Sequence, residues 1–369
     1  MDIKARNLSL DVFRGITICF MIIVNTPGNG DCVFGPLNHA RWHGFTPTDL
    51  VFPSFLFAVG NAIYFGMKSW QSMNSSAVYS KILKRTAIIF LLGFLMYWFP
   101  FVHHTNNGLA FNPFSHTRIL GVLQRIALCY GIGAILIYRF SWKTILIIAC
   151  SLLLVYWGLM AWGGDYNMLT QLGQKIDLAI LGENHMYHGE GVAFEPEGIL
   201  STLPSIVNVL AGYLTALFML NGGVDKNKLM RLAILGLGLL LLSWGWNELF
   251  PINKKLWTSS FVLQTVGWDL IILSFLTYSI DILNARVGVS FFRTAGRNPL
   301  VIYLLSEVLA ILLGFLSNSN GQSWSSGIYD AVFSHAGCYV GSFLYAVCFM
   351  LVCWSLGWWL DKRGVYIKV

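Results

Sequence analysis

The sequence predicts an all-α polytopic membrane protein, a single bundle of about ten transmembrane helices with both termini in the cytoplasm. Of its 369 residues, 56% are hydrophobic and only 11% are charged, whereas soluble domains have about 45–50% apolar and about 25% charged residues. The apolar residues form long runs without charge, such as 87–99 and 233–245. Several such runs reach the ~20 residues that a bilayer span needs. A secreted soluble enzyme, a coiled coil and a nucleic-acid-binding module are therefore excluded.

The predicted helices, in chain order, occupy residues 9–26, 49–67, 84–101, 118–138, 142–161, 201–220, 230–250, 258–279, 298–316 and 337–360. Asn25 ends the first helix, and Thr48 with Asp49 caps the second. Asn298 caps the ninth helix, and Pro299 takes its first position. The longest connection, about 162–200, has the length of loops that often serve as lids or binding segments. We expect one integral-membrane domain over residues 1–369, with this loop on the outer side.

The basic residues divide unevenly between the two faces of this arrangement. Of the 24 Lys and Arg residues, 17 fall on one face and 5 on the other, and Arg14 and Arg125 lie within helices. Cytoplasmic loops accumulate Lys and Arg, so the division predicts cytoplasmic termini. The net charge of +7 then follows from topology, and we expect membrane lipid rather than nucleic acid as a partner. The larger set is Lys4, Arg6, Lys68, Lys81, Lys84, Arg85, Arg139, Lys143, Lys226, Lys228, Arg231, Arg286, Arg293, Arg297, Lys362, Arg363 and Lys368, and the smaller is Arg41, Arg118, Lys175, Lys254 and Lys255.

Two groups of charged residues lie in or at the start of predicted helices, where charge is costly and indicates function. Asp11 and Arg14 share one face of the first helix, either as a structural ion pair or as functional residues. Arg118 and Arg125 lie about 10 Å apart along one face of the fourth helix, with Gln124 in the same stretch. Two such guanidinium groups suit an anionic ligand, because Arg binds phosphate in a bidentate manner. The alternative is pairing with one of three carboxylates in or at the ends of helices: Asp49, Asp269 or Glu307.

The segment 25–57, between the first two helices, is rich in polar and turn-forming residues. Gly and Pro in its first half predict an irregular loop. His39 lies there, at the predicted mouth of the bundle, and imidazole is the usual general base near neutral pH; the alternative is a surface histidine without a role. The spacing of His39 and His43 would suit a metal only on a helix, so we expect no metal. Cys32 and Cys338 are both expected near the outer face, and their pairing stays open.

Two further stretches place charge at the outer rim. Residues 194–198, FEPEG, precede the sixth helix and contain Glu195 and Glu197. Residues 251–257, PINKKLW, put Lys254 and Lys255 on the outer side, against the topology rule. Each stretch has a local structural explanation, so neither identifies chemistry by itself.

Five motifs follow one another along the chain: SLDVFRG at 9–15, HAxWxGxTxxDLVFP at 39–53, GVLQR at 121–125, EPEG at 195–198 and PINKxLW at 251–257. In this order they resemble the heparan-α-glucosaminide N-acetyltransferase family, and the chain is most similar to its bacterial members, from residue 8 to about 303. It departs from the lysosomal members at Glu195, where they have Asp. The resemblance implies a bacterial inner (cytoplasmic) membrane protein and, by analogy, a homodimer.

The resemblance also implies a transmembrane acyl transfer from cytoplasmic acetyl-CoA to a glucosamine-like amine on the other side. His39 of the HAxW motif matches the family's catalytic histidine, and Asn25 matches a nearby family asparagine. His39 would take the proton of the sugar ammonium or accept the acetyl group itself. The Asn25 amide would donate to the developing oxyanion. Whether the reaction passes through an acetyl-histidine or a ternary complex stays open.

The remaining site residues are assigned by their charge and polarity. Coenzyme A phosphates need cations, and an amino sugar needs carboxylates and other polar groups. We expect Arg14, Arg118, Gln124 and Arg125 to bind coenzyme A, and Asp49, Glu197 and Lys254 to bind the acceptor. Two alternative functions stay open. One is acyl transfer to another cell-wall or lipid-linked glycan, and the other is small-molecule transport along intramembrane charges.

Overall fold

The computed structural model describes residues 7–105, 108–317 and 321–367, so Lys4, Arg6 and Lys368 of the larger basic set lie outside the described residues. The chain forms two compact units. Unit 1 comprises Met1–His39, Thr46–Phe55 and Phe275–Lys368, and unit 2 comprises Ala40–Phe45 and Leu56–Ser274. The prediction of one domain over the whole chain stays a prediction.

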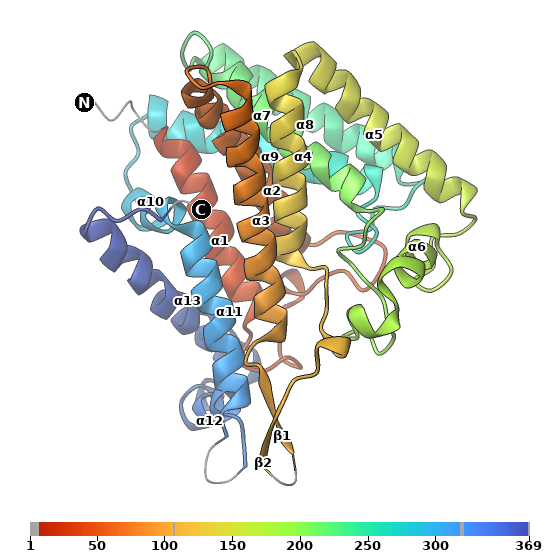
Figure 1. Ribbon diagram of the computed structural model, residues 1–369. Helices are drawn as coiled ribbons and strands as arrows, with labels where there is room; N and C mark the ends of the chain where they lie inside the picture. The colour runs from red at the N-terminus through yellow and green to blue at the C-terminus, as the bar shows by residue number, and fades with distance from the viewer. Residues whose placement is uncertain (1–6, 106–107, 318–320, 368–369) are drawn as a thin grey trace. The chain divides into compact units, whose positions relative to one another are not determined.

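Unit 1 contains α1 (Leu8–Asn25), the start of α2 (Pro47–Trp70), α10 (Val289–Arg297), α11 (Pro299–Phe315), α12 (Trp324–Ile328), α13 (Cys338–Lys362) and π-helical turns at Tyr278–Ile282 and Tyr329–Phe333 (Figure 1). Helices α1 and α10 pack with their backbones in close contact. A Cβ added at Gly15 would lie 1.8 Å from the Phe292 carbonyl oxygen, and one at Gly296 would lie 1.9 Å from that of Asp11. Only glycine permits this approach.

A disulfide joins two distant segments of unit 1. Cys32, in the loop after α1, is bonded to Cys338 at the start of α13, and their Cα atoms are 5.6 Å apart. The same contact is supported by the Gly28 N–H, which donates to the Ser342 carbonyl oxygen at 3.2 Å. The structure therefore contains the disulfide between Cys32 and Cys338 that the sequence left open.

Unit 2 contains the rest of α2, α3 (Ser75–Trp98), a hairpin of β1 (Val102–Thr105) and β2 (Gly108–Phe111), α4 (Val122–Arg139), α5 (Trp142–Trp162), α6 (Leu172–Leu181), α7 (Thr202–Leu220), α8 (Lys226–Trp246) and α9 (Ser259–Thr277, whose last residues belong to unit 1). The hairpin is antiparallel, with Val102 opposite Phe111. Helix α4 packs against α3 and α7, and α5 against α7. A buried cluster that includes Tyr156, Phe194 and Phe250 lies beneath the long loop between α5 and α7.

All ten predicted helices are present among the described residues. Eight elements are individually long and apolar enough to cross a membrane, and α10 with α11 makes a ninth if the pair, bent by 81°, is one span. The tenth, α3, is 24 residues long but carries Lys81, Lys84 and Arg85 in its first half. The prediction of an all-α polytopic membrane protein is confirmed. The cytoplasmic position of both termini stays a prediction.

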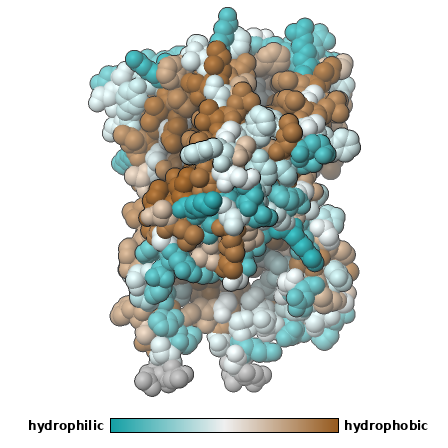
Figure 2. Space-filling view, turned by 90° about the vertical axis from the view of Figure 1, so that its right-hand side faces the viewer, coloured by the Kyte–Doolittle hydropathy of each residue, from teal (hydrophilic) through white to brown (hydrophobic). Residues whose placement is uncertain are grey.

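Large apolar side chains also cover outward-facing parts of these helices. Those of α5 and α8 include Ile147, Leu154, Leu241 and Trp244, all exposed. The side on which α5 and α6 are drawn in Figure 1 faces the viewer in Figure 2, where hydrophobic side chains form extensive brown areas. Exposed apolar surface of this extent marks contact with an apolar environment, as a membrane protein requires.

The structure corrects the start of the fourth helix. The predicted helix at 118–138 begins only at Val122, so Arg118 precedes it. The reason is tertiary: the Ile119 N–H donates to the His185 carbonyl oxygen at 3.2 Å, and the Thr117 carbonyl oxygen is 2.8 Å from His185 Nδ1. The stretch before α4 therefore bonds to the long outer loop instead of extending the helix. That loop itself contains α6, which the sequence did not predict.

Candidate functional site

A histidine–aspartate pair lies in unit 1, where the irregular loop meets α2. His39 Nδ1 is 2.7 Å from Asp49 Oδ1; the histidine side chain is 43% exposed, and that of the aspartate is fully buried. The other carboxylate oxygen, Oδ2, accepts the backbone N–H of Thr46 at 3.0 Å and its hydroxyl at 3.1 Å. Since α2 begins at Pro47, the Asp49 carboxylate caps the start of the helix by accepting both donors of Thr46. The cap thus holds the carboxylate that orients His39.

This arrangement suits proton transfer. An ionised carboxylate on Nδ1 favours the tautomer with its proton there, which leaves Nε2 as the basic nitrogen. The carboxylate also stabilises the imidazolium that forms when Nε2 takes a proton. Asp49, which the sequence assigned to the acceptor, therefore lies where it positions His39.

The residues that follow His39 are anchored in unit 2. Trp42 Nε1 donates to the Tyr166 carbonyl oxygen at 3.0 Å, and the Gly44 N–H donates to that of Ile252 at 2.8 Å. The PINKKLW stretch and the long outer loop thus both hold the segment that connects His39 to Thr46.

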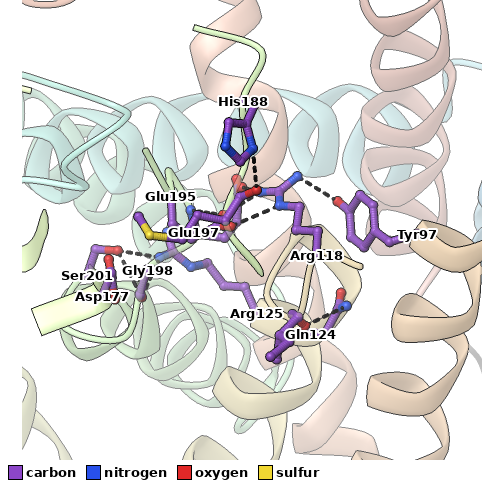
Figure 3. A network of polar contacts seen from close by, with 12 residues as sticks. Tyr97, Arg118, Gln124, Arg125, Asp177, His188, Glu195, Glu197, Gly198 and Ser201 are labelled. Atoms are coloured by element: carbon purple, nitrogen blue, oxygen red, sulfur yellow. Dashed lines mark hydrogen bonds and ion pairs between the residues drawn. The ribbon is translucent and has the colours of Figure 1, made fainter. Parts of the chain in front are cut away.

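The centre of unit 2's polar network is Arg118 (Figure 3). Its Nε donates to Glu195 Oε2 at 2.9 Å, and its Nη2 donates to Glu195 Oε1 and to Glu197 Oε2, the latter at 2.7 Å. Its Nη1 donates to the Tyr97 hydroxyl at 3.1 Å. The rings of Tyr97 and Tyr187 lie 4.7 and 4.8 Å from the guanidinium carbon, within the range of a cation–π contact. Each nitrogen of the guanidinium group is therefore engaged.

The cluster holds two carboxylates for one cation. Burial raises the pKa of the Glu195 carboxyl, although Arg118 beside it acts in the opposite direction. Burial alone would lower the pKa of Arg118, but its bonds to the two carboxylates raise it overall. When both carboxylates are ionised the group has a net charge of −1. Glu197 is partly exposed, so this excess negative charge is accessible to a cation from solvent.

A second buried pair fixes the loop that carries these carboxylates. Asp177 Oδ1 accepts the Ile199 N–H at 2.8 Å, and Arg125 Nη2 donates to the Gly198 carbonyl oxygen at 3.0 Å and to the Ser201 hydroxyl. A Cβ added at Gly198 would lie 2.0 Å from Asp177 Oδ2, so only glycine fits there. Burial raises the pKa of Asp177 to about 6, with the Ile199 N–H and Arg125 opposing it.

Comparison with known proteins places these motifs in a family. The sequence family described as "Heparan-alpha-glucosaminide N-acetyltransferase, catalytic" matches residues 6–250, which is more than half of the chain. The chain belongs to the heparan-α-glucosaminide N-acetyltransferase family. Proteins of that name from Mus musculus and Homo sapiens are each 29% identical to it, over 81% of this chain and 53% and 52% of their own lengths. The chain therefore spans about half the length of these curated relatives.

Three predicted coenzyme A ligands of this family member lie in unit 2. Arg118 pairs with Glu195 and Glu197. The alternative partners considered from the sequence were three other carboxylates: Asp49, Asp269 and Glu307. Arg125 is 1% exposed and its guanidinium carbon lies 5.0 Å from the Trp257 ring centre. Gln124 is also buried, and its Nε2 donates to the Ile119 carbonyl oxygen at 3.0 Å. Arg118 and Arg125 therefore contact the outer loop, whereas Gln124 contacts the stretch before α4.

The other predicted residues are placed as follows. Arg14 pairs with Asp11 at 3.5 Å, which was one of the two alternatives, and its Nη1 also donates to the Gly296 carbonyl oxygen at 3.2 Å. Asn25 is the last residue of α1, as predicted, and is exposed. Lys254 is half-buried in the turn before α9. Among the residues that the structure describes, no group of three or more His, Cys, Asp or Glu side chains could hold a metal ion.

Sequence reasoning missed Asp177 and Tyr97 as parts of the network. Asp177 lies in a long loop with several acidic residues, and Tyr97 stands in an apolar run. The one available signal for Asp177 was a carboxylate within the mostly apolar stretch 176–181, which indicates a buried partner.

Proposed function

We propose that this chain is a transmembrane N-acetyltransferase, which moves the acetyl group of cytoplasmic acetyl-CoA to the amine of a glucosamine-like sugar on the other side of the membrane. Family membership supports acetyl transfer, and the His39–Asp49 pair is the observation that carries the mechanism. A hexosamine is mostly an ammonium ion at neutral pH, so its nitrogen needs a base before it can attack a thioester.

In the direct route, His39 Nε2 takes a proton from the amine as its nitrogen attacks the thioester carbonyl carbon. The C–N bond forms, the C–S bond breaks, and the leaving thiolate receives the proton from the imidazolium. In the covalent route, Nε2 attacks the thioester carbonyl carbon, the C–S bond breaks, and coenzyme A leaves as a thiolate. The amine nitrogen then attacks the carbonyl carbon of acetyl-histidine, the bond from that carbon to Nε2 breaks, and the proton that the nitrogen loses neutralises the thiolate. Asn25 is the proposed donor to the oxyanion in both routes. Asp49 has the same positioning role in each.

For the donor, we propose that Arg14 contacts the coenzyme A phosphates. We also propose that Arg118 and Arg125 hold the outer loop, because Arg118 bonds Glu195 and Glu197 and Arg125 bonds the Gly198 carbonyl oxygen. The predicted contacts of Arg118, Gln124 and Arg125 with coenzyme A stay a prediction.

For the acceptor, we propose that Glu197 binds the sugar ammonium. Its carboxylate is partly exposed, and the Arg118 cluster has an excess of negative charge. Lys254 remains a proposed contact for sugar hydroxyl groups. Glucosamine is the proposed acceptor class, and a cell-wall or lipid-linked amino sugar is the alternative.

The first test measures free-thiol release from acetyl-CoA by the purified protein, with and without glucosamine, for the unsubstituted chain and His39→Ala. Release that needs both the sugar and His39 supports the proposal. Acetylated His39, detected by mass spectrometry without acceptor, would select the covalent route. An absence of release with every amino sugar tried would contradict the proposal and favour the transporter.

The second test addresses the acceptor. Glu197→Gln removes the accessible charge and should raise the KM for the amino sugar about 10- to 100-fold, the value of one charge-assisted hydrogen bond, with little change in kcat. Glu190→Gln is the matched control, since Glu190 lies in the same loop but pairs with Lys255 at 2.7 Å. Equal KM values in the two variants would contradict the role of Glu197.

A further inference from the structure

Helix α6, in the long loop of unit 2, buries two polar side chains and exposes large apolar ones. Gln174 and Asp177 are buried, as is Gln171 just before the helix, while Leu178 and Ile180 are exposed, Ile180 by 65%. A helix on a water-facing surface turns its apolar residues inward and its polar residues outward. Single exposed apolar residues are common, but α6 combines them with buried Gln174 and Asp177 in one short helix.

The buried polar face has specific partners. Gln174 Nε2 donates to the Ala193 carbonyl oxygen at 2.7 Å, and Asp177 accepts the Ile199 N–H at 2.8 Å. Both partners belong to the segment that carries Glu195 and Glu197. The inward orientation of this face is therefore fixed by hydrogen bonds, and the apolar face has to point outward.

The apolar face continues an exposed surface that begins on α5. Trp162, the last residue of α5, is 82% exposed, and Leu169, in the connection to α6, is exposed as well. Gly163 lies against Leu172, since an added Cβ would meet that side chain at 2.6 Å, so α6 starts directly at the end of α5. Figure 1 shows α6 next to that end. Helix α5 is a candidate membrane span whose residues are mostly exposed, and its outward face is therefore a lipid-facing one.

We propose that α6 lies in the membrane interface, with Leu178, Ile180 and Trp162 among the lipid acyl chains and its polar face turned toward the protein. Interfacial helices bury their apolar face about 5–10 Å into the boundary between headgroups and acyl chains. The exposed Lys175 is long enough to extend its ammonium group to the headgroups. This inference does not depend on the acetyltransferase proposal.

Lipid accounts for this surface better than a second copy of the chain does. Exposed apolar residues occur at the end of a candidate span, in the connection and on α6, and a span's outward face meets lipid along its length. Aromatic residues such as Trp162 are also enriched at the membrane–water boundary. A second copy is the alternative occupant, and the experiment below separates the two.

The test uses a nitroxide spin label at position 180, introduced as Ile180→Cys in a chain that also carries Cys150→Ser and Cys348→Ser, because these are the exposed free cysteines among the described residues. The protein is reconstituted into phosphatidylcholine–phosphatidylglycerol vesicles. Power-saturation EPR then compares collisions with oxygen, which partitions into lipid, and with a water-soluble nickel chelate. Asn184→Cys, at an exposed polar residue of the same loop, is the matched control.

We expect the oxygen-to-nickel ratio at position 180 to be several-fold higher than at position 184. Leu178→Cys should give the same result and replaces Ile180→Cys if that variant fails to fold. A ratio at both positions equal to that of the control would place the face in water and overturn the proposal. Dipolar broadening that disappears when labelled protein is diluted with unlabelled protein would show that a second copy covers the face, which also overturns it.

Discussion

Replacement of Asp49 by Asn tests whether this residue sets the tautomer of His39. Asp49 Oδ2 accepts the backbone N–H of Thr46, and Oδ1 faces His39 Nδ1. In the Asp49→Asn variant the amide oxygen has to stay on the Thr46 N–H, since that donor is fixed by the backbone. The amide NH₂ group then faces Nδ1 and donates to it. His39 is thereby driven to carry its proton on Nε2, where it cannot act as a base.

The size of the effect follows from two losses. Return to the active tautomer breaks the new neutral hydrogen bond, at about 0.5–1.5 kcal/mol, and the imidazolium loses a charge-assisted bond of about 1.5–3 kcal/mol. The sum is about 2–4 kcal/mol, and each 1.36 kcal/mol is a factor of ten in rate. We therefore expect kcat to fall about 30- to 1,000-fold, while the KM for the acceptor changes little.

The assay is steady-state thiol release at saturating acetyl-CoA, with thermal unfolding in the same detergent as a check of folding. The amide oxygen of Asn preserves the cap on α2, so the variant should unfold within about 1 kcal/mol of the unsubstituted protein. Asp49→Ala, which forces neither tautomer, should keep more activity than Asp49→Asn if it folds. A kcat for Asp49→Asn within a factor of ~2 of the unsubstituted protein would refute the reasoning.

Three further predictions concern the outer loop and the disulfide. The Asp177→Asn variant should be more stable than the unsubstituted protein, and its advantage should be larger at pH 7 than at pH 5. The reason is that burial raises the pKa of Asp177 in the folded state to about 6, so the folded state loses stability as the pH rises through that value. An equal difference at both pH values would contradict the raised pKa of Asp177. Gly198→Ala should lower stability by about 1–3 kcal/mol, since its Cβ would lie 2.0 Å from Asp177 Oδ2, and an unfolding temperature unchanged from the parent would be inconsistent with that clash. Reductant should lower the unfolding temperature of the parent but not of a Cys32→Ser, Cys338→Ser double variant, because a disulfide typically contributes about 2–4 kcal/mol; an identical response of both proteins would mean that the bond does not form.

Local signals in the sequence were sufficient for the helices and for the chemistry of single residues. Hydrophobic runs of bilayer length identify all ten helices, because a span in lipid has to satisfy its backbone internally and cover itself with apolar side chains. Asn25 ends α1 and Pro299 opens α11 as predicted, since caps and helix starts depend on neighbouring residues. The HAxW motif, through its resemblance to the family, predicts His39 as the catalytic residue, and this stays a prediction.

Only the tertiary structure decided which charged residues pair and which side chains face the interior. Arg118 and Glu195 are far apart in the chain, and nothing in their local sequence shows that they pair. Helix α4 starts later than predicted because His185, which is distant in the sequence, bonds the backbone that precedes it. These hydrogen bonds outweigh the helix propensity of that stretch. Asp177 faces inward on α6 because it accepts a backbone N–H from a separate segment of the chain. Composition and periodicity follow from local chemistry, whereas these pairings depend on which segments the fold brings together, and that is a property of the packed chain as a whole.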